Sequence, residues 1–173
     1  MKKFVLVLIV SLIAMNCFSQ GVKYSKVIYS EGKTAQELYS LSRQWIARGF
    51  SQPKKTIQVE DDNTFFIGCK ASCQVFNSMS SFYGWVDYTL IIQCKDGRLK
   101  VEITDLTHTS NRVQQYGDSN LGLIEDKDNQ FTSGMFYGAK NKACADIKEY
   151  FKTYTEAIFS SLSEYLNAEQ EEW

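Results

Sequence analysis

One dipeptide, Asp96-Gly97, constrains the fold of this chain most strongly, because Asp-Gly is a frequent two-residue turn of a β-hairpin. Two long runs flank it, Phe82 to Lys95 and Arg98 to Leu106. Pairing these runs about the turn brings apolar residues together: Cys94 with Leu99, Ile92 with Val101, and Leu90 with Ile103. A slip of one residue would move every one of them to the other side. The pairing therefore predicts an antiparallel sheet with one buried face.

The elements around this hairpin complete an α+β pattern. Residues 22–30, 56–60 and 64–76 are rich in β-branched and aromatic residues or alternate in polarity, and we expect three further strands there. Thr34 and Glu37 form a capping box at the start of a helix, which we expect Gly49 to end in a left-handed conformation. A second helix begins near Asn141. Its apolar stripe is made of Ile147, Phe151, Tyr154, Ile158, Leu162 and Tyr165 or Leu166.

Residues 107–140, which connect the hairpin to the last helix, mix Gly, Asn, Asp and Ser with scattered apolar residues. A structureless loop of this length is uncommon in a compact domain, so we expect a short strand or a folded flap. If the flap closes over the uncovered side of the sheet, it makes a second small core there. Otherwise that side stays open.

The first nineteen residues have the three zones of a cleavable signal peptide. Lys2 and Lys3 precede the apolar run 4–15, and Ser19 has the small side chain needed before a cut ahead of Gln20. This run is too short for a membrane-spanning helix, which needs about 20 residues. We therefore expect residues 20–173 to form one exported domain, periplasmic or secreted. In the alternative, Cys17 is lipidated and anchors the domain to a membrane.

Charge and cysteine content narrow the possible partners. Without Lys2 and Lys3 the chain has 17 basic and 20 acidic side chains, and no basic block that would favour nucleic acid. No second apolar run is long enough to span a membrane. An oxidising compartment allows three disulfide pairings among Cys69, Cys73, Cys94 and Cys144. Within one strand Cys69 and Cys73 would lie about 13 Å apart, whereas a disulfide needs Cα atoms within about 7 Å.

No residue pattern indicates catalysis. The single histidine, His108, has no second histidine with which to form a zinc site, and we expect it to be solvated at a strand end. Cys69 and Cys73 lie on the apolar side of a strand and are expected to be buried thiols or halves of disulfides. Of the acidic runs 60–62 and 125–128, the second has carboxylates at alternate positions but lacks the glycine and distal glutamate of a calcium loop, and we expect a solvated turn. We therefore expect no enzyme activity, no cofactor and no metal site.

A surface is the remaining candidate. The strand alternation places Phe66, Tyr83, Trp85 and Ile91 on the uncovered side of the sheet, beside the polar residues Asp87, Thr89 and Gln93. Aromatic side chains on an exposed sheet face are suited to anchor a partner or a ligand.

Several segments resemble a bacterial family, the domain of unknown function 4468, which has a fold like that of the TATA-binding protein. They are residues 27–34 leading into the helix of Trp45, the strand 82–95, and Ser160-Ser161-Leu162 ahead of Trp173. The resemblance implies a curved antiparallel sheet with helices on one side. It implies no activity and no site residues, and the fold does not by itself imply DNA binding.

These observations lead to two expectations of function. The first is a non-enzymatic binding or interaction module of the bacterial envelope, whose partner is an unknown protein. The alternative is a carrier of a small apolar, lipid-like ligand, held in a cavity between the sheet and the C-terminal helix.

Overall fold

The computed structural model describes residues 21–75, 82–111 and 119–168. The predicted signal peptide, the lipidation alternative at Cys17, the turn at residues 78–81 and Trp173 lie outside the described residues.

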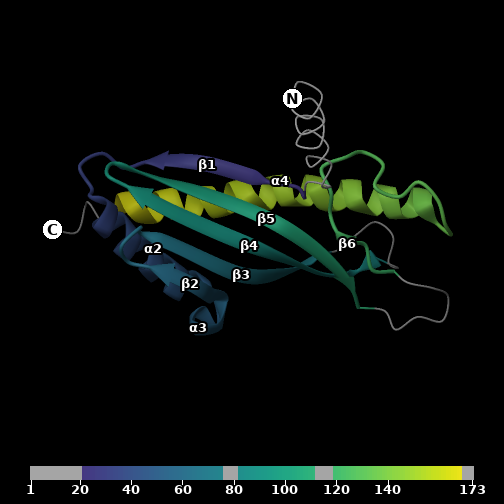
Figure 1. Cartoon of the computed structure of the whole chain (residues 1–173), viewed down its shortest axis with the longest axis horizontal. Coiled ribbons are helices and arrows are strands. Elements are labelled where there is room, and N and C mark those ends of the chain that lie inside the picture. The colour runs from purple at the N-terminus through teal and green to yellow at the C-terminus, as the bar shows by residue number, and fades with distance from the viewer. Residues whose placement is uncertain (1–20, 76–81, 112–118, 169–173) are drawn as a thin grey trace, which may run out of the picture.

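A single antiparallel sheet of six strands forms one layer of the domain (Figure 1). Five strands lie in the order β1-β5-β4-β3-β2, and the short β6 pairs with β5. Their bounds are β1 Tyr24–Tyr29, β2 Ile57–Asp61, β3 Phe66–Val75, β4 Gly84–Lys95, β5 Arg98–Ser110 and β6 Gly122–Leu123. The predicted α+β class with an open antiparallel sheet is confirmed.

The hairpin between β4 and β5 has the predicted register. Cys94 pairs with Leu99, Ile92 with Val101, and Leu90 with Ile103. Further from the turn the register shifts between Asp87 and Thr89, where β5 has one residue more than β4. Asp105 takes a left-handed conformation there, with a φ of 58°. An extra residue of this kind is a β-bulge, which bends the strand and increases its twist.

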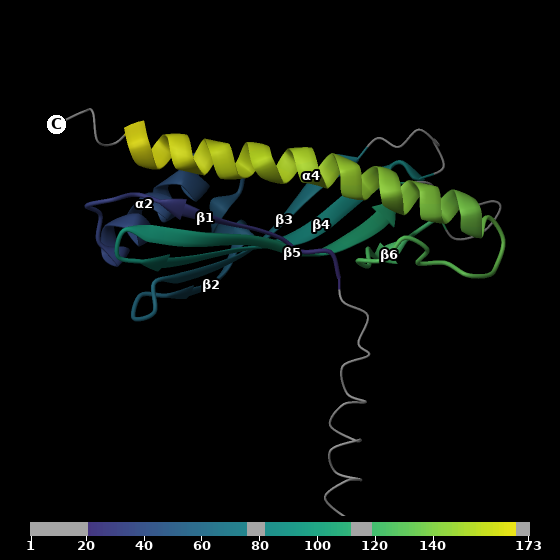
Figure 2. The same ribbon diagram turned by 90° about the horizontal axis from the view of Figure 1, so that it is seen from above.

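Two main helices cover one side of the sheet, and none of the described helices lies on the other side (Figure 2). They are α2 (Ala35–Gly49) and the long α4 (Tyr137–Ala168), and a single turn, α3 (Pro53–Thr56), precedes β2. The capping box of α2 is present, with the Thr34 N–H donating to Glu37 Oε2 at 2.7 Å. Gly49 was predicted to end α2 in a left-handed conformation, but its φ is not positive. Phe50 caps the end of the helix: its backbone is extended, its N–H donates to the Ile46 carbonyl, and its ring packs edge-on against Trp45.

The helices and the sheet enclose one apolar core. The α4 stripe includes the predicted Ile147, Phe151, Leu162 and Leu166, all buried, but near its middle the buried residue is Phe159 and not Ile158. Phe159 is one residue further along, so the buried stripe follows a slightly different path around the helix. Ile158 lies at the margin of the core. Tyr154, also at the margin, shares a hydrogen bond of 3.0 Å with Tyr88.

The connection between β5 and α4 contains the predicted short strand. β5 continues to Ser110, so the first part of the expected flap belongs to the sheet, and α4 begins at Tyr137, earlier than predicted. β6 continues the edge next to β1: the Leu106 carbonyl accepts from the Ile124 N–H, and the Ile124 carbonyl accepts from the Val22 N–H. Leu121 and Ile124 join the main core. The described part of this connection, residues 119–136, therefore extends the sheet edge and makes no second core.

Candidate functional site

The uncovered side of the sheet, called the open face below, carries large side chains that water reaches. Trp85 is 45% exposed and Tyr83 is 38% exposed, both at one end of β4. Phe66 and Ile91, the other two predicted site residues, are half-buried. All four lie where the strand alternation predicts, since Val86, Tyr88, Leu90 and Ile92 between them are buried toward the helices.

A glycine positions the exposed pair. Gly84 separates Tyr83 from Trp85, and a Cβ atom at Gly84 would lie 2.0 Å from the backbone oxygen of Thr109. Only a residue without a side chain allows β4 and β5 to approach so closely there. Trp85 lies opposite Thr109 on β5 and Gln74 on β3. The backbone of β4 therefore determines where both aromatic side chains lie.

Phe66 and Ile91 form a second group, nearer the β4–β5 turn. Ile91 pairs with Gly68, and the Cβ position of Gly68 lies only 3.3 Å from Cε1 of Phe66. The Phe66 ring thus occupies the space above Gly68. Ile91 is six residues from Trp85 along β4, or about 20 Å in an extended strand. The four predicted residues therefore share one face but form two separate groups.

Sequence reasoning missed three apolar contributors to this face. Val27 and Tyr29 on the edge strand β1 are 43% and 68% exposed, and Val59 on β2 is 55% exposed. Ile57 and Val59 are two residues apart and would point the same way in a regular strand. A register shift between them turns Val59 to the open face, where it lies near Gly68, while Ile57 packs at the margin of the core. Alternation within β2 alone carries no signal of this shift.

The open face is basic at the β4–β5 turn. Lys95 pairs with Arg98, and Lys100 follows on the same side of β5. They help to line a shallow hollow of about 200 Å³, together with Val27, Tyr29, Gln93 and Leu99. Glu102 lies beside it, but Lys100 at 2.8 Å and Lys23 at 2.5 Å neutralise its charge. Both lysines hold the pKa of Glu102 below its ordinary value.

The histidine and the acidic runs, which were considered as catalytic or metal-binding residues, belong to the core or to local turns. His108 is 1% exposed, so the expectation of a solvated histidine is wrong. Its Nδ1 accepts from the Leu121 N–H at 3.3 Å, and Nε2 lies 3.0 Å from the Phe82 oxygen. Within residues 21–75, 82–111 and 119–168 no three metal-ligating side chains converge. Asp61 accepts from the Asn63 N–H in a turn, and Glu125 pairs with Lys127.

All four described cysteines are free thiols. Cys69, Cys94 and Cys144 are buried and Cys73 is half-buried. Burial raises the pKa of Cys69 and of Cys73 to about 12, and that of Cys94 and of Cys144 to about 11. Because the thiolate is the reactive form, these are poor nucleophiles. Cys69 and Cys73 lie on one strand, β3, as predicted.

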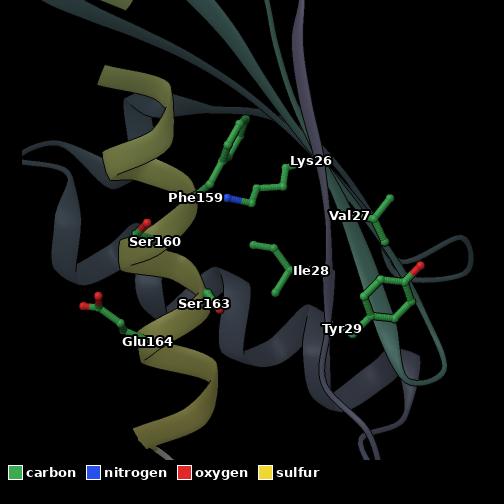
Figure 3. Close-up of a pocket in the computed structure, with 8 residues that line it drawn as sticks. All are labelled: Lys26, Val27, Ile28, Tyr29, Phe159, Ser160, Ser163 and Glu164. Atoms are coloured by element: carbon green, nitrogen blue, oxygen red, sulfur yellow. The ribbon is translucent and has the colours of Figure 1, made fainter. Parts of the chain in front are cut away.

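A groove of about 320 Å³ separates the edge strand β1 from α4 (Figure 3). Lys26 and Ile28 point from β1 toward the helix, whereas Val27 and Tyr29 point away from it. Lys26 reaches across the groove to Glu156 at 2.8 Å. Between the sheet and α4, the space is filled by core side chains: Tyr88, Phe151 and Phe159 are at most 2% exposed. In the described part of the chain, no helix is both long and apolar enough to cross a membrane.

Comparison with known proteins places the fold but assigns no activity. Residues 24–109 match the family model described as a domain of unknown function (DUF4468) with TBP-like fold. The structure is similar to a TBP-like protein from Parabacteroides distasonis, with a TM-score of 0.61 and 14% identity over 82% of this chain and 92% of that one. It is also similar to a DUF4468 family protein from Bacteroides ovatus, with a TM-score of 0.58 and 18% identity over 84% and 86% of the two chains. No curated protein matches the sequence.

Proposed function

Because the chain belongs, through residues 24–109, to the DUF4468 family of domains with a TBP-like fold, and this family carries no known activity, we propose a function from the geometry. The chain is an exported, non-enzymatic binding module, and it holds a partner protein on the open face. The observation that supports this most directly is the 45% exposure of Trp85, a large aromatic residue within a regular strand.

The two groups on the open face would act as separate anchors. Tryptophan and tyrosine are enriched among the residues that contribute most to binding energy, because they bury a large area with few rotatable bonds. Trp85 and Tyr83 would enter the partner at one end of β4. Phe66, Ile91 and Val59 would form a flatter apolar contact nearer the turn. A partner that covers both groups must extend about 20 Å along the strand.

The charge of the face favours an acidic partner. Lys95, Arg98 and Lys100 are exposed at the turn end, and Lys70 on β3 is exposed near the middle. Asp87 is the exposed acidic residue of β4, and the charge of Glu102 is already neutralised. Complementary charges mainly increase the association rate and the specificity. We therefore expect a protein partner that combines apolar side chains with carboxylates, and whose binding weakens as salt is raised.

Recovery of a partner from an envelope extract of the host tests this function. Tyr83→Ala combined with Trp85→Ala should remove the partner and lower the melting temperature only slightly, because neither side chain belongs to the buried core. Tyr150→Ala is a matched control, since Tyr150 is 43% exposed on α4, on the covered side of the sheet. Loss of the partner in the double variant and its retention in the control are expected. Equal recovery in both would contradict the proposal.

A carrier of a small apolar ligand is the second candidate, because Ile28 and Phe159 line the groove between β1 and α4. The ligand would lie in this groove and not beneath the middle of α4, where side chains fill the space. Native mass spectrometry of protein purified from its host should then detect a bound lipid-like mass, and Ser163→Trp, which fills the groove, should eliminate it. A clean mass, with no thermal shift on addition of fatty acid, would exclude this role.

A further inference from the structure

Three consecutive large side chains project into water where the chain enters α4. Met135 is 76% exposed, Phe136 is 63% exposed and Tyr137 is 52% exposed. No other run of consecutive residues in the described part of the chain exposes three large apolar side chains. We call residues 135–137 the apolar knuckle. Single exposed apolar residues are ordinary on protein surfaces, but a contiguous group indicates a contact surface.

The fold holds the knuckle in a defined shape. At its base, Asn141 Oδ1 accepts from the Phe131 N–H at 2.8 Å, and Asn141 Nδ2 donates to the Phe131 oxygen at 2.8 Å. Gly134 has a φ of 95° and Phe136 a φ of 63°. A bulky residue in the left-handed region is strained by about 1–3 kcal/mol and persists only where its surroundings enforce it. The side chains are therefore presented by a closed and ordered turn.

The knuckle lies at one end of the molecule. The N-terminal end of α4 extends past the strands of the sheet in both views (Figures 1 and 2). The knuckle is thus a protrusion and not part of the open face. A convex apolar protrusion needs a fitted pocket in a protein partner, whereas the interfacial region of a lipid bilayer accommodates it without one.

The charge around the knuckle favours an anionic surface. Residues 129–145 contain two basic residues, Lys140 and Lys142, and no acidic residue. Lys142 is exposed, and Lys140 Nζ lies 5.2 Å from the ring centroid of Phe131. The nearest acidic residues in the sequence, Asp128 and Asp146, lie outside this stretch. Aromatic side chains beside lysines are the combination found where proteins dock on anionic bilayers.

We propose that the apolar knuckle inserts into the interfacial region of an anionic lipid bilayer and docks the domain on it peripherally. Phe136 and Met135 enter the acyl boundary, and the Tyr137 hydroxyl stays at the level of the headgroups. Lys140 and Lys142 contact lipid phosphates. This contact is independent of the partner proposed for the open face, and it needs no membrane-spanning helix.

Flotation with lipid vesicles tests the proposal on the exported form of the full chain. We expect binding to phosphatidylcholine vesicles that contain about 30% phosphatidylglycerol, and less binding to phosphatidylcholine alone. Met135→Ser combined with Tyr137→Ser should lower the vesicle-bound fraction about tenfold, because it removes two inserting side chains. Lys142→Glu should lower it only on the anionic vesicles. All variants have the same N-terminus, so a contribution of residues 1–20 to vesicle binding would be equal in all of them.

Two further variants make the result decisive. Phe136→Trp adds a fluorophore in the knuckle to the three tryptophans of the parent chain. Compared with the parent, its emission should shift further to the blue on vesicle binding and be quenched more strongly by brominated lipids. Tyr83→Ala with Trp85→Ala should bind vesicles as the parent does, which separates this proposal from the open-face function. The proposal is overturned if the parent chain stays unbound, if Met135→Ser with Tyr137→Ser binds equally well, or if Phe136→Trp is quenched no more strongly than the parent. In each case a protein pocket would replace the bilayer as the occupant to be sought.

Discussion

Nε2 of His108 lies 3.0 Å from the backbone oxygen of Phe82, so the single histidine joins β5 to the start of β4 from within the core. Because Nδ1 accepts from the Leu121 N–H, Nε2 must carry the proton and donate to Phe82. The ring is therefore neutral, and it links the β4–β5 pair to the segment that leads into β6. Protonation of Nδ1 would abolish the bond to Leu121.

This arrangement predicts that the domain loses stability in mild acid. Burial lowers the pKa of His108 in the folded state below its ordinary value of 6.5. The unfolded chain therefore binds the proton first, and the contribution of His108 is complete above the unfolded pKa and falls as the pH drops below it. The free energy of unfolding, measured in urea from pH 8 to pH 5, should decrease through this window. His108→Gln, compared at each pH, should be less stable at pH 8 and show a smaller decrease. Parallel curves for the two proteins would contradict the prediction.

A second prediction concerns the glycine between the exposed aromatic residues. In Gly84→Ala the new Cβ would lie 2.0 Å from the Thr109 oxygen and 2.8 Å from the Ser110 Cα atom. Both are backbone atoms of the paired strand and cannot rotate away. We expect destabilisation of about 2–4 kcal/mol in urea unfolding.

Gly138→Ala is the matched control for this substitution. Gly138 lies in the first turn of α4, with nothing within 4 Å of its Cβ position. Alanine is the better helix former by about 0.5–1 kcal/mol, so this variant should be unchanged or slightly more stable. If Gly84→Ala changes the unfolding free energy as little as Gly138→Ala does, β4 and β5 can move apart at Gly84 without loss of stability, and the prediction is wrong.

A third prediction concerns Asp96, which does more than form the hairpin turn. Its Oδ1 accepts from the Ala35 N–H at 2.8 Å, in the first turn of α2. The neighbouring Gly97 exchanges backbone hydrogen bonds with Lys33 and Ser30, so the turn is joined to the β1–α2 connection. Asp96→Ala should cost about 1 kcal/mol or more in unfolding free energy, since it removes a helix-terminal acceptor. Asp96→Asn keeps an acceptor and a favourable turn residue, and should lose less. Equal losses would show that the contact with α2 contributes nothing.

The sequence predicted the parts of this structure that depend on local pattern and on one well-defined turn. The hairpin register, the capping box at Thr34 and Glu37, and the exposed side of β4 all follow from spacing alone. The bulge at Asp105 was missed because it adds one residue to β5 without interrupting the apolar pattern of β4. His108 was misjudged because its partners are 26 and 13 residues away, and because the strand was expected to end at Leu106, whereas β5 continues to Ser110.

The sequence predicted the side of the sheet on which the candidate site lies, but not all of the residues that form it. Phe66, Tyr83, Trp85 and Ile91 were placed on the correct side by the strand alternation. Val27 and Tyr29 lie on the same face because β1 pairs with β5. These two strands are distant in the sequence, so no local pattern predicts that they pair. Whether residues 107–140 would cover the face also depended on long-range pairing. The short β6 adds to the sheet edge, and the aromatic side chains stay exposed.

The last prediction is that the protein keeps its four described cysteines as thiols even if it is exported as proposed. The four described cysteines are unpaired even though export to an oxidising compartment would allow disulfides. Burial raises their pKa values to between about 11 and about 12, so almost no thiolate forms at pH 8. In the folded protein we expect slow labelling by a thiol reagent, with half-buried Cys73 the first to react. Unfolding without a reducing agent should release all of Cys69, Cys73, Cys94 and Cys144 for labelling. Cys73→Ser should remove the fast phase, and a pair that stays unlabelled until reduction would show that an oxidised form exists.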